Sequence, residues 1–157
     1  LLFVDPDVQF NNDFLKNAIS QLNERKIDVA GCYIIPLGNN VIDIIYFGIF
    51  NLWIFTTQFF YPNASGGGIF CRKTIHKKVN GFDETIKLSE DMNYVKRCSN
   101  YGKFRILNNA KTHISVRRFE REGRLKLGAK LFLSVVYRLF FGEIRSDIFK
   151  YNLRYRK

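Results

Sequence analysis

The sequence predicts an α/β fold, because short apolar runs of strand length alternate with longer segments of helical periodicity. The 46% apolar and 25% charged residues are typical of a globular chain and exclude disorder and collagen-like repeats. A length of 157 residues matches one domain with a single core. The predicted strands are residues 1–4, 28–36, 69–72, 104–107 and 112–116, and the predicted helices are residues 13–26, 41–60, 74–79, 90–101 and 125–141.

The N-terminal elements are bounded by turn-forming residues. Residues 1–4 form an apolar run typical of a buried strand, which Pro6 ends because proline cannot donate to a ladder. Asn11 or Asn12 can cap the helix that follows. The apolar segment 41–60 has its densest part in twelve residues, fewer than the ~20 that span a bilayer. It is therefore predicted to be a buried or interfacial helix.

Glycines mark the boundaries of the C-terminal elements. The strand 69–72 follows a serine and three glycines. The helix before Gly81 and the helix before Gly102 both end there, since glycine is the usual residue after a helix C-terminus. Residues 125–141 combine basic and apolar side chains at helical spacing and form the last predicted helix.

The charge of the chain is uneven. Lysine and arginine number 25 against 14 acidic residues, which gives a net charge of +11. Residues 111–157 hold 13 basic and 4 acidic residues and so carry +9 of that charge. A basic C-terminal segment on a nearly neutral body points to an anionic partner such as nucleic acid, a phosphorylated substrate or acidic lipid.

The three cysteines, Cys32, Cys71 and Cys98, are odd in number and form no CxxC pair. They argue for a reducing compartment and against a disulfide framework or a zinc site. Each is predicted to be a small buried hydrophobe. The chain opens on an apolar run without a basic leader, so no signal peptide is expected.

Asp5 and Asp7 directly follow the first predicted strand. On an extended segment, residues two apart point the same way, so the pair makes a pocket for a hard divalent cation. The carboxyl ends of strands are also where open α/β sheets bind ligands. A solvated turn centred on Pro6 is the alternative interpretation.

Glu90 and Asp91 form a second acidic pair at a predicted helix start. One of these carboxylates can act as a general base that takes a proton from an attacking hydroxyl. The alternative is structural, because acidic residues stabilise a helix N-terminus through the macrodipole and by capping.

Three further groups are candidate ligand contacts. The glycines 66–68 lack the Lys-Ser or Lys-Thr that follows in a P-loop, so they are not assigned to that motif. Three glycines still let the backbone approach a ligand closely. A plain flexible turn is the alternative. Arg117 and Arg118 suit diphosphate oxygens, and His113 can bind metal or donate a proton. A surface arginine pair and a core histidine are the alternatives.

These motifs follow one another in a specific order. They are Asp-Pro-Asp at 5–7, the glycines 66–68, Gly-Phe-Asp-Glu at 81–84, Glu90-Asp91, and Ser-Val-Arg-Arg-Phe at 115–119 followed by Gly123. Over about residues 1 to 125 this order resembles the C-terminal half of a family 2 glycosyltransferase. The resemblance implies a partial GT-A fold, Rossmann-like, with a mixed but mostly parallel sheet flanked by helices. It divides the chain into 1–124, part of the catalytic domain, and 125–157, a basic amphipathic helical tail.

The resemblance also implies a reaction, the transfer of a sugar from a nucleotide-diphosphate donor, such as a UDP-sugar, to an acceptor hydroxyl with inversion. Asp5 would contact the nucleotide, and Asp7 would bind Mg²⁺ or Mn²⁺, with His113 near the metal. Asp91 would be the base and Glu90 its support.

The remaining implied roles concern the donor and the acceptor. Gly67 and Gly68 would lie near the donor sugar, and Arg117 and Arg118 near the diphosphate or an acidic acceptor. The acceptor would be a saccharide or a lipid-linked molecule. The Gln-x-x-Arg-Trp element of polymer-forming members is absent, so a non-processive enzyme is expected. The nucleotide-binding half of the family precedes these motifs and is missing, so this chain alone is expected to be an inactive fragment.

The basic segment 125–141 suits an anionic membrane surface better than nucleic acid, because no RNP, KH or zinc-finger pattern is present. A cytoplasmic, peripherally membrane-associated protein without a nucleic-acid partner is therefore expected. Two alternatives stay open. A haloacid-dehalogenase-like phosphatase also begins with an apolar strand and DxD, although Gly-Phe-Asp-Glu has no role there. The other is a non-enzymatic basic module that binds membranes or nucleic acid.

Overall fold

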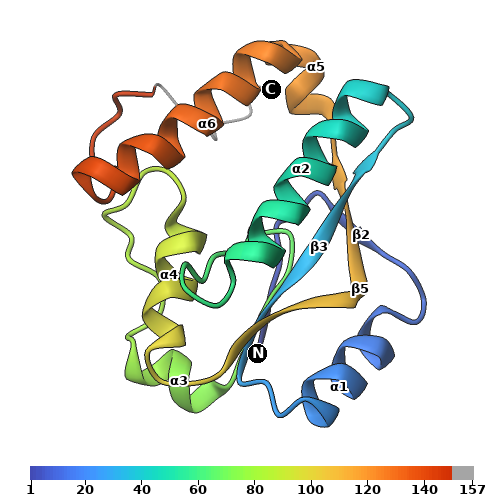
Figure 1. The fold of residues 1–157 in the computed structure, drawn as a ribbon, viewed down its shortest axis with the longest axis vertical. Helices are drawn as coiled ribbons and strands as arrows, with labels where there is room; N and C mark the ends of the chain where they lie inside the picture. The colour runs from blue at the N-terminus through green and yellow to red at the C-terminus, as the bar shows by residue number, and fades with distance from the viewer. Residues whose placement is uncertain (150–157) are drawn as a thin grey trace.

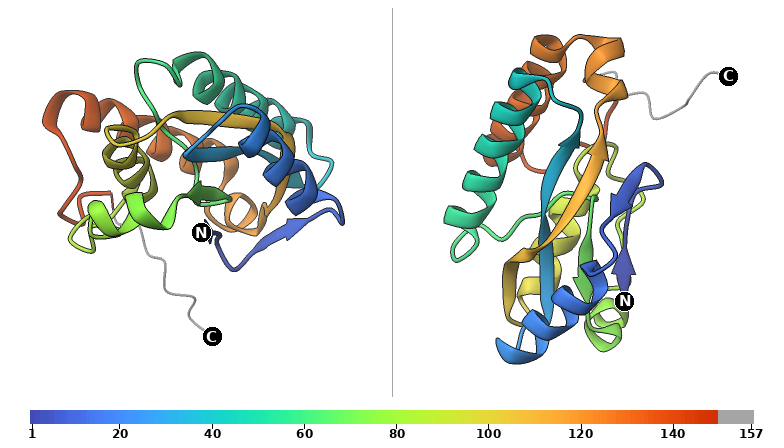
Figure 2. Two further views of the ribbon diagram at one scale, coloured as in Figure 1. Left: turned by 90° about the horizontal axis from the view of Figure 1, so that it is seen from below. Right: turned by 90° about the vertical axis from the view of Figure 1, so that its right-hand side faces the viewer.

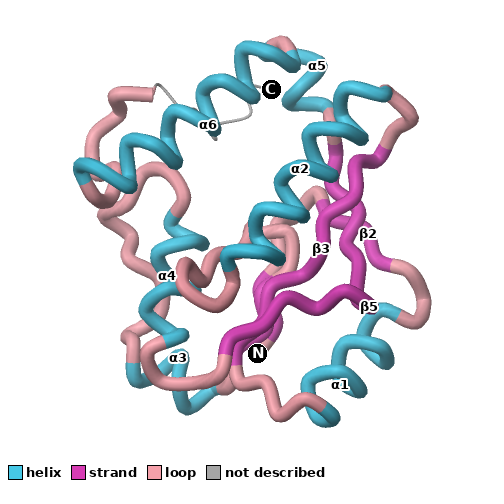
Figure 3. The backbone as a smooth tube through the Cα atoms, in the orientation of Figure 1, coloured by secondary structure: helices cyan, strands magenta, loops and turns pink. Residues whose placement is uncertain are grey.

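The computed structural model describes residues 1–149, which form a curled five-stranded sheet with helices packed against it (Figure 1). The strand order is β1-β4-β3-β5-β2. Figure 3 shows the strands in magenta and labels β3, β5 and β2. The strands are β1 Leu2–Phe3, β2 Val8–Phe10, β3 Val29–Leu37, β4 Ile69–Cys71 and β5 Phe104–Ser115. The helices are α1 Phe14–Glu24, α2 Val41–Thr57, α3 Lys73–Lys78, α4 Glu90–Ser99, α5 Arg117–Glu122 and α6 Arg124–Phe141. The last part of the predicted tail, residues 150–157, lies outside the described residues.

The sheet is mixed, and the prediction of a mostly parallel sheet was wrong. Only β3 and β5 run parallel to each other. The pairs β1·β4, β3·β4 and β2·β5 are antiparallel. The mixed α/β class itself is confirmed.

The direction of β4 is reversed by the segment between α2 and β4. The Asn51 side chain of α2 bonds to both backbone groups of Ile34, in the later half of β3. The chain then reaches Ala64, which packs so closely on Gly31 that a side chain there would collide with it. It returns to the level of Ile34 at Gly67 before β4 begins. Because this segment runs from the level of Gly31 back towards the C-terminal end of β3, β4 starts from that end and pairs antiparallel with β3.

The two edge strands β1 and β2 are joined by a tight turn, which requires the sheet to curl (Figure 2). The backbone N–H of Val8 donates to the carbonyl of Asp5 at 3.3 Å. Residues 5–8 are therefore a β-turn with Pro6 at its second position, the position that proline favours. The acidic pair sits on this turn, which matches the alternative interpretation of a turn centred on Pro6 and not the extended segment.

Alternating residues of β3 face two different core clusters, as expected for a strand buried on both faces. Ala30 and Cys32 pack towards Phe14 of α1, whereas Val29 belongs to the cluster that includes Ile54 of α2. A third cluster joins α2, α5 and α6 and includes Phe47, Phe119 and Leu127. Cys32, Cys71 and Cys98 are free and buried, as predicted.

The structure refines several predicted elements. Strands 104–107 and 112–116 are one strand, β5, interrupted by a register shift where Leu107 and then Lys111 oppose Cys32 and Tyr33. Asp13 occupies the N-cap of α1 without a side-chain bond, so neither predicted asparagine caps it. β2 and α5 were not predicted. No helix within residues 1–149 combines the length and apolar character needed to cross a membrane.

Candidate active site

Gly66 joins the two acidic pairs through its backbone. The N–H of Asp5 donates to the carbonyl of Gly66 at 3.1 Å. The N–H of Gly66 in turn donates to Oδ2 of Asp91 at 2.7 Å. Two motifs that are far apart in the sequence thus meet at one residue.

The carboxylates of this cluster interact electrostatically. Burial raises the pKa of Asp5, and the charges of Asp7 and Glu90 raise it further. Mutual repulsion of this kind requires the acidic pair at residues 5 and 7 to lie within a short distance of the pair at residues 90 and 91. A cation placed among them would relieve that repulsion.

Asp91 has the more strongly perturbed carboxyl group. Its Oδ1 accepts the N–H of Met92 at 2.8 Å, so both of its oxygens hold a backbone donor. Burial and the neighbouring charge of Glu90 nevertheless raise the pKa of Asp91 to about 7. A carboxylate with a pKa near neutrality is suited to accept a proton in catalysis.

Gly-Phe-Asp-Glu fixes the loop that leads to α4. The ring of Phe82 stacks on Tyr94 with centroids 4.0 Å apart. Arg97 donates to the carbonyl of Gly81 at 2.7 Å, and Asp83 accepts the N–H of Thr85 at 3.0 Å. These contacts make the motif a support for the position of the Glu90-Asp91 pair.

The C-terminal end of α6 supports α4 from the other side. Arg138 is buried and forms an ion pair with Glu143 at 2.9 Å, and its guanidinium contacts the sulfur of Met92. Glu143 also accepts from the Asn93 side chain. The end of α6 therefore packs on the helix that carries Asp91.

The three glycines allow close packing at the turn. A side-chain carbon on Gly66 would lie 2.8 Å from Oδ2 of Asp5. The corresponding atom on Gly67 would lie 2.6 Å from Ile114, and that on Gly68 would lie 3.1 Å from Cys32. The predicted contacts of Gly67 and Gly68 with a donor sugar stay a prediction.

The other predicted site residues lie on or after β5. His113 pairs with Gln9 of β2 and Ile35 of β3 in the sheet register, which puts it two positions along the ladder from the level of Asp7. Arg117 contacts Ser115 at 3.1 Å, and Arg118 pairs with Glu122 at 2.9 Å. Their predicted contacts with diphosphate or metal stay predictions.

A divalent cation is compatible with the acidic cluster. Residues 1–149 contain no group of three or more His, Cys, Asp and Glu side chains placed to hold a metal ion together. Magnesium sites, however, commonly use one or two protein carboxylates together with waters and substrate phosphates. Asp5 and Asp7, whose charges repel each other, fit that type of site.

Two contributions were not predicted. Gly66 was expected only as one of three glycines that let the backbone approach a ligand. Its link between the two acidic pairs was not predicted, because it acts through backbone N–H and C=O groups that every residue except proline carries. The Arg138–Glu143 pair was missed because an arginine in a basic segment is indistinguishable from a solvated one. The spacing of five residues between the two charges was the only available signal.

No protein family and no curated protein matches the sequence. Among solved structures, the crystal structure of S. aureus TarS, a glycosyltransferase, matches with a TM-score of 0.51 and 17% sequence identity. The match covers 96% of this chain, which spans 30% of the TarS chain. At this identity the likeness is one of fold alone. The chain therefore has a glycosyltransferase-like fold.

Proposed function

We propose that this protein takes part in glycosyl transfer from a nucleotide-diphosphate sugar to an acceptor hydroxyl. The observation that carries the proposal is the hydrogen bond from Gly66 to Asp91, which brings a carboxylate with a pKa of about 7 to the Asp5–Asp7 turn. The glycosyltransferase-like fold supports it independently. A UDP-sugar donor and a saccharide or lipid-linked acceptor belong to the same proposal.

In the proposed reaction, Asp91 takes the proton of the acceptor hydroxyl. The acceptor oxygen then forms a bond to the anomeric carbon from the face opposite the leaving group. The bond between that carbon and the diphosphate oxygen breaks, and its electron pair leaves with the nucleoside diphosphate. One direct displacement of this kind inverts the anomeric configuration. Glu90 supports Asp91, because its charge helps keep the pKa of Asp91 high.

Asp7 would hold Mg²⁺ or Mn²⁺, with Asp5 directed to the nucleotide and His113 near the metal. When bound, the cation supplies positive charge that stabilises the diphosphate leaving group. Gly67 and Gly68 are proposed to lie near the donor sugar. Arg117 and Arg118 follow the end of β5 and are proposed to face the diphosphate or an acidic acceptor.

The test is a transfer assay on the natural full-length protein that contains this sequence. Nucleoside diphosphate release and the sugar product are measured with a panel of UDP-sugars, Mn²⁺ and saccharide or lipid-linked acceptors. We expect transfer that Asp91→Asn lowers by at least ~10²-fold. Asp13→Asn is a matched control, since Asp13 lies at the start of α1 outside the acidic cluster. Transfer that persists unchanged in Asp91→Asn would overturn the assignment.

A further inference from the structure

Helix α2 is apolar on the side that faces solvent as well as on the side that faces the sheet. Phe47 and Ile54 are buried against the core. On the opposite side, four large apolar residues are each more than half exposed: Val41, Ile45, Ile49 and Leu52. A helix that is apolar all round is normally covered on all sides, by protein or by lipid. The outer side of α2 therefore requires a covering that residues 1–149 do not provide.

Helix α6 has the same arrangement. Leu127, Ser134 and Arg138 face inward and are buried. The outward residues Leu125, Phe132, Leu133 and Phe140 are each more than half exposed. The basic side chains predicted to form the polar face do not lie outward as a set, because Lys130 pairs with Glu122 and Arg138 with Glu143. The outer side of α6 is thus mostly apolar, with Lys126 exposed beside it.

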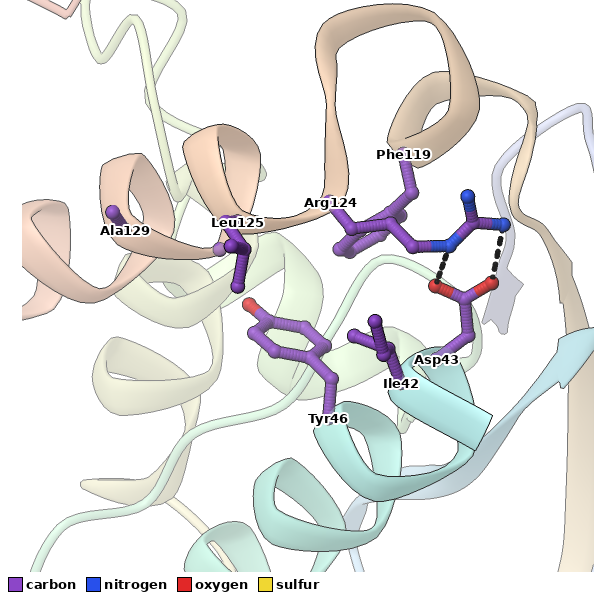
Figure 4. A pocket seen from close by; sticks show the side chains of 8 residues that line it. Ile42, Asp43, Tyr46, Phe119, Arg124, Leu125 and Ala129 are labelled. Atoms are coloured by element: carbon purple, nitrogen blue, oxygen red, sulfur yellow. Dashed lines mark hydrogen bonds and ion pairs between the residues drawn. The ribbon is translucent and has the colours of Figure 1, made fainter. Parts of the chain in front are cut away.

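The two apolar sides meet where the helices begin. An open cleft of about 210 Å³ lies between the start of α2 and the start of α6 (Figure 4). Ile42 and Tyr46 line it from α2, and Leu125 and Ala129 line it from α6. Ile42 and Leu125 are also among the exposed residues. We call the combined outer sides of α2 and α6, with this cleft, the α2–α6 face.

The exposed charges on the two helices of the α2–α6 face are of one sign. Asp43 is the only acidic residue in the two helices, and it is fully buried in an ion pair with Arg124 at 2.9 Å. Lys126 is exposed on α6, and the neighbouring α5 carries both an exposed Arg121 and an exposed Glu120, whose carboxylate lies 3.6 Å from Arg124. The face therefore offers cations at its rim and no exposed carboxylate on its helices.

We propose that the α2–α6 face docks on a lipid bilayer that carries anionic headgroups. A bilayer accepts an apolar surface of any shape, and anionic headgroups complement the cations at the rim. A second copy of the chain is a poorer partner for this face. A symmetric contact would bring the same cations together, and neither helix offers a solvent-exposed carboxylate to pair with them. The proposal does not depend on transferase activity.

The test is flotation of the natural protein that contains this sequence with vesicles of phosphatidylcholine alone and of phosphatidylcholine mixed with phosphatidylglycerol. We expect binding to the mixed vesicles that is stronger than to the neutral ones and weaker at high salt. Leu52→Glu and Phe132→Glu should each lower the partition coefficient by about tenfold or more, because each places a charge in the apolar contact. Leu52→Ser serves as a milder variant with the same expected direction.

Leu15→Glu is the matched control. Leu15 lies on α1 and is 53% exposed, against 64% for Leu52, but it is not part of the α2–α6 face. Its variant should float as the wild type does. Wild-type flotation by the α2 and α6 variants, or no flotation of the wild type, would overturn the proposal. The wild type could instead form a dimer that Leu52→Glu dissociates and fail to bind vesicles. That outcome would overturn the proposal and make the face an interface between copies of the chain.

Discussion

Asp91 accepts the backbone N–H of Gly66 through Oδ2 at 2.7 Å, although the two residues are 25 positions apart. The bond ties the first turn of α4 to the glycine turn that precedes β4. Because the carbonyl of Gly66 also accepts from Asp5, the separation of the two acidic pairs is set by one residue's backbone. The chemistry of Asp91 and the spacing of the cluster can therefore be tested by separate substitutions.

The pH dependence of transfer tests Asp91 as the base. Since its pKa is raised to about 7, kcat/KM should rise with pH and level off above neutrality as the carboxylate becomes deprotonated. Asp91→Asn should lower the rate by at least ~10²-fold and remove this limb of the profile. The measurement is the initial transfer rate as a function of pH. If Asp91→Asn keeps both the transfer rate and the pH profile of the wild type, Asp91 is not the base and has only a structural role at the N-terminus of α4.

Gly66→Ala tests the spacing of the cluster without removing a carboxylate. The new carbon would lie 2.8 Å from Oδ2 of Asp5, so this carboxylate must move. Gly66 has no left-handed φ, so alanine is not strained by its backbone. We expect transfer to fall by roughly tenfold or more, because small displacements of catalytic groups are costly. Thermal stability should change little.

Gly48→Ala is the control for this substitution. Gly48 lies inside α2, and a side chain there would meet nothing within 4 Å. Alanine at such a helix position should stabilise the protein by about 0.5–1 kcal/mol and leave transfer unchanged. If Gly66→Ala transfers at the wild-type rate, the position of Asp5 does not matter for the reaction.

Cation binding tests Asp7. With a nucleoside diphosphate present, the protein should bind Mn²⁺, and Asp7→Asn should weaken that binding by about tenfold or more because a charged oxygen ligand is lost. Mn²⁺ binding is followed directly by electron paramagnetic resonance, and transfer is measured with and without a chelator. Undiminished transfer in chelator would remove the metal from the proposal.

The type of most elements follows from local sequence patterns, but their direction in the sheet does not. The apolar patterns correctly locate β3 and α2, since burial periodicity is a local property. The antiparallel entry of β4 depends on the path of residues 58–68, which is set by the contact of Ala64 with Gly31. No local pattern indicates that contact. The same limit applies to β5, whose two apolar runs join through a register shift.

The candidate site was predictable where it depends on residue type. Two acidic pairs at a strand end and a helix start were evident from the sequence, and the structure brings both to Gly66. The support from Arg138 was not evident, because a buried cation is recognised only by its partner. Tertiary contacts decide whether such a charge lies inward or in solvent.

The ion pair between Asp43 and Arg124 tests how firmly α6 is held to α2. It is bidentate, with bonds of 2.9 and 3.0 Å (Figure 4). Asp43→Ala should lower the free energy of unfolding by about 1–3 kcal/mol, since Arg124 keeps only its longer contact with Glu120. Chemical denaturation measures this change. The double variant Asp43→Leu with Arg124→Leu should lose less of the free energy of unfolding than Asp43→Ala alone. A larger loss in the double variant would contradict the pairing.

The pH dependence of stability tests the burial of Asp91 without reference to activity. The pKa of its carboxyl group is about 7 in the folded protein and near 3.8 when unfolded. Between these values the folded state binds more protons than the unfolded state, so the free energy of unfolding falls as pH rises. The stability due to Asp91 is thus fully present below its unfolded pKa and is lost as pH rises through about 7. A pKa shift of this size corresponds to a few kcal/mol of the free energy of unfolding, at about 1.4 kcal/mol per unit of pKa.

Asp91→Asn removes this titration, so the stability of the variant relative to the wild type should increase from acidic to neutral pH. Thermal melts of both proteins across that range measure the difference, and a difference that is constant with pH would contradict a raised pKa for Asp91.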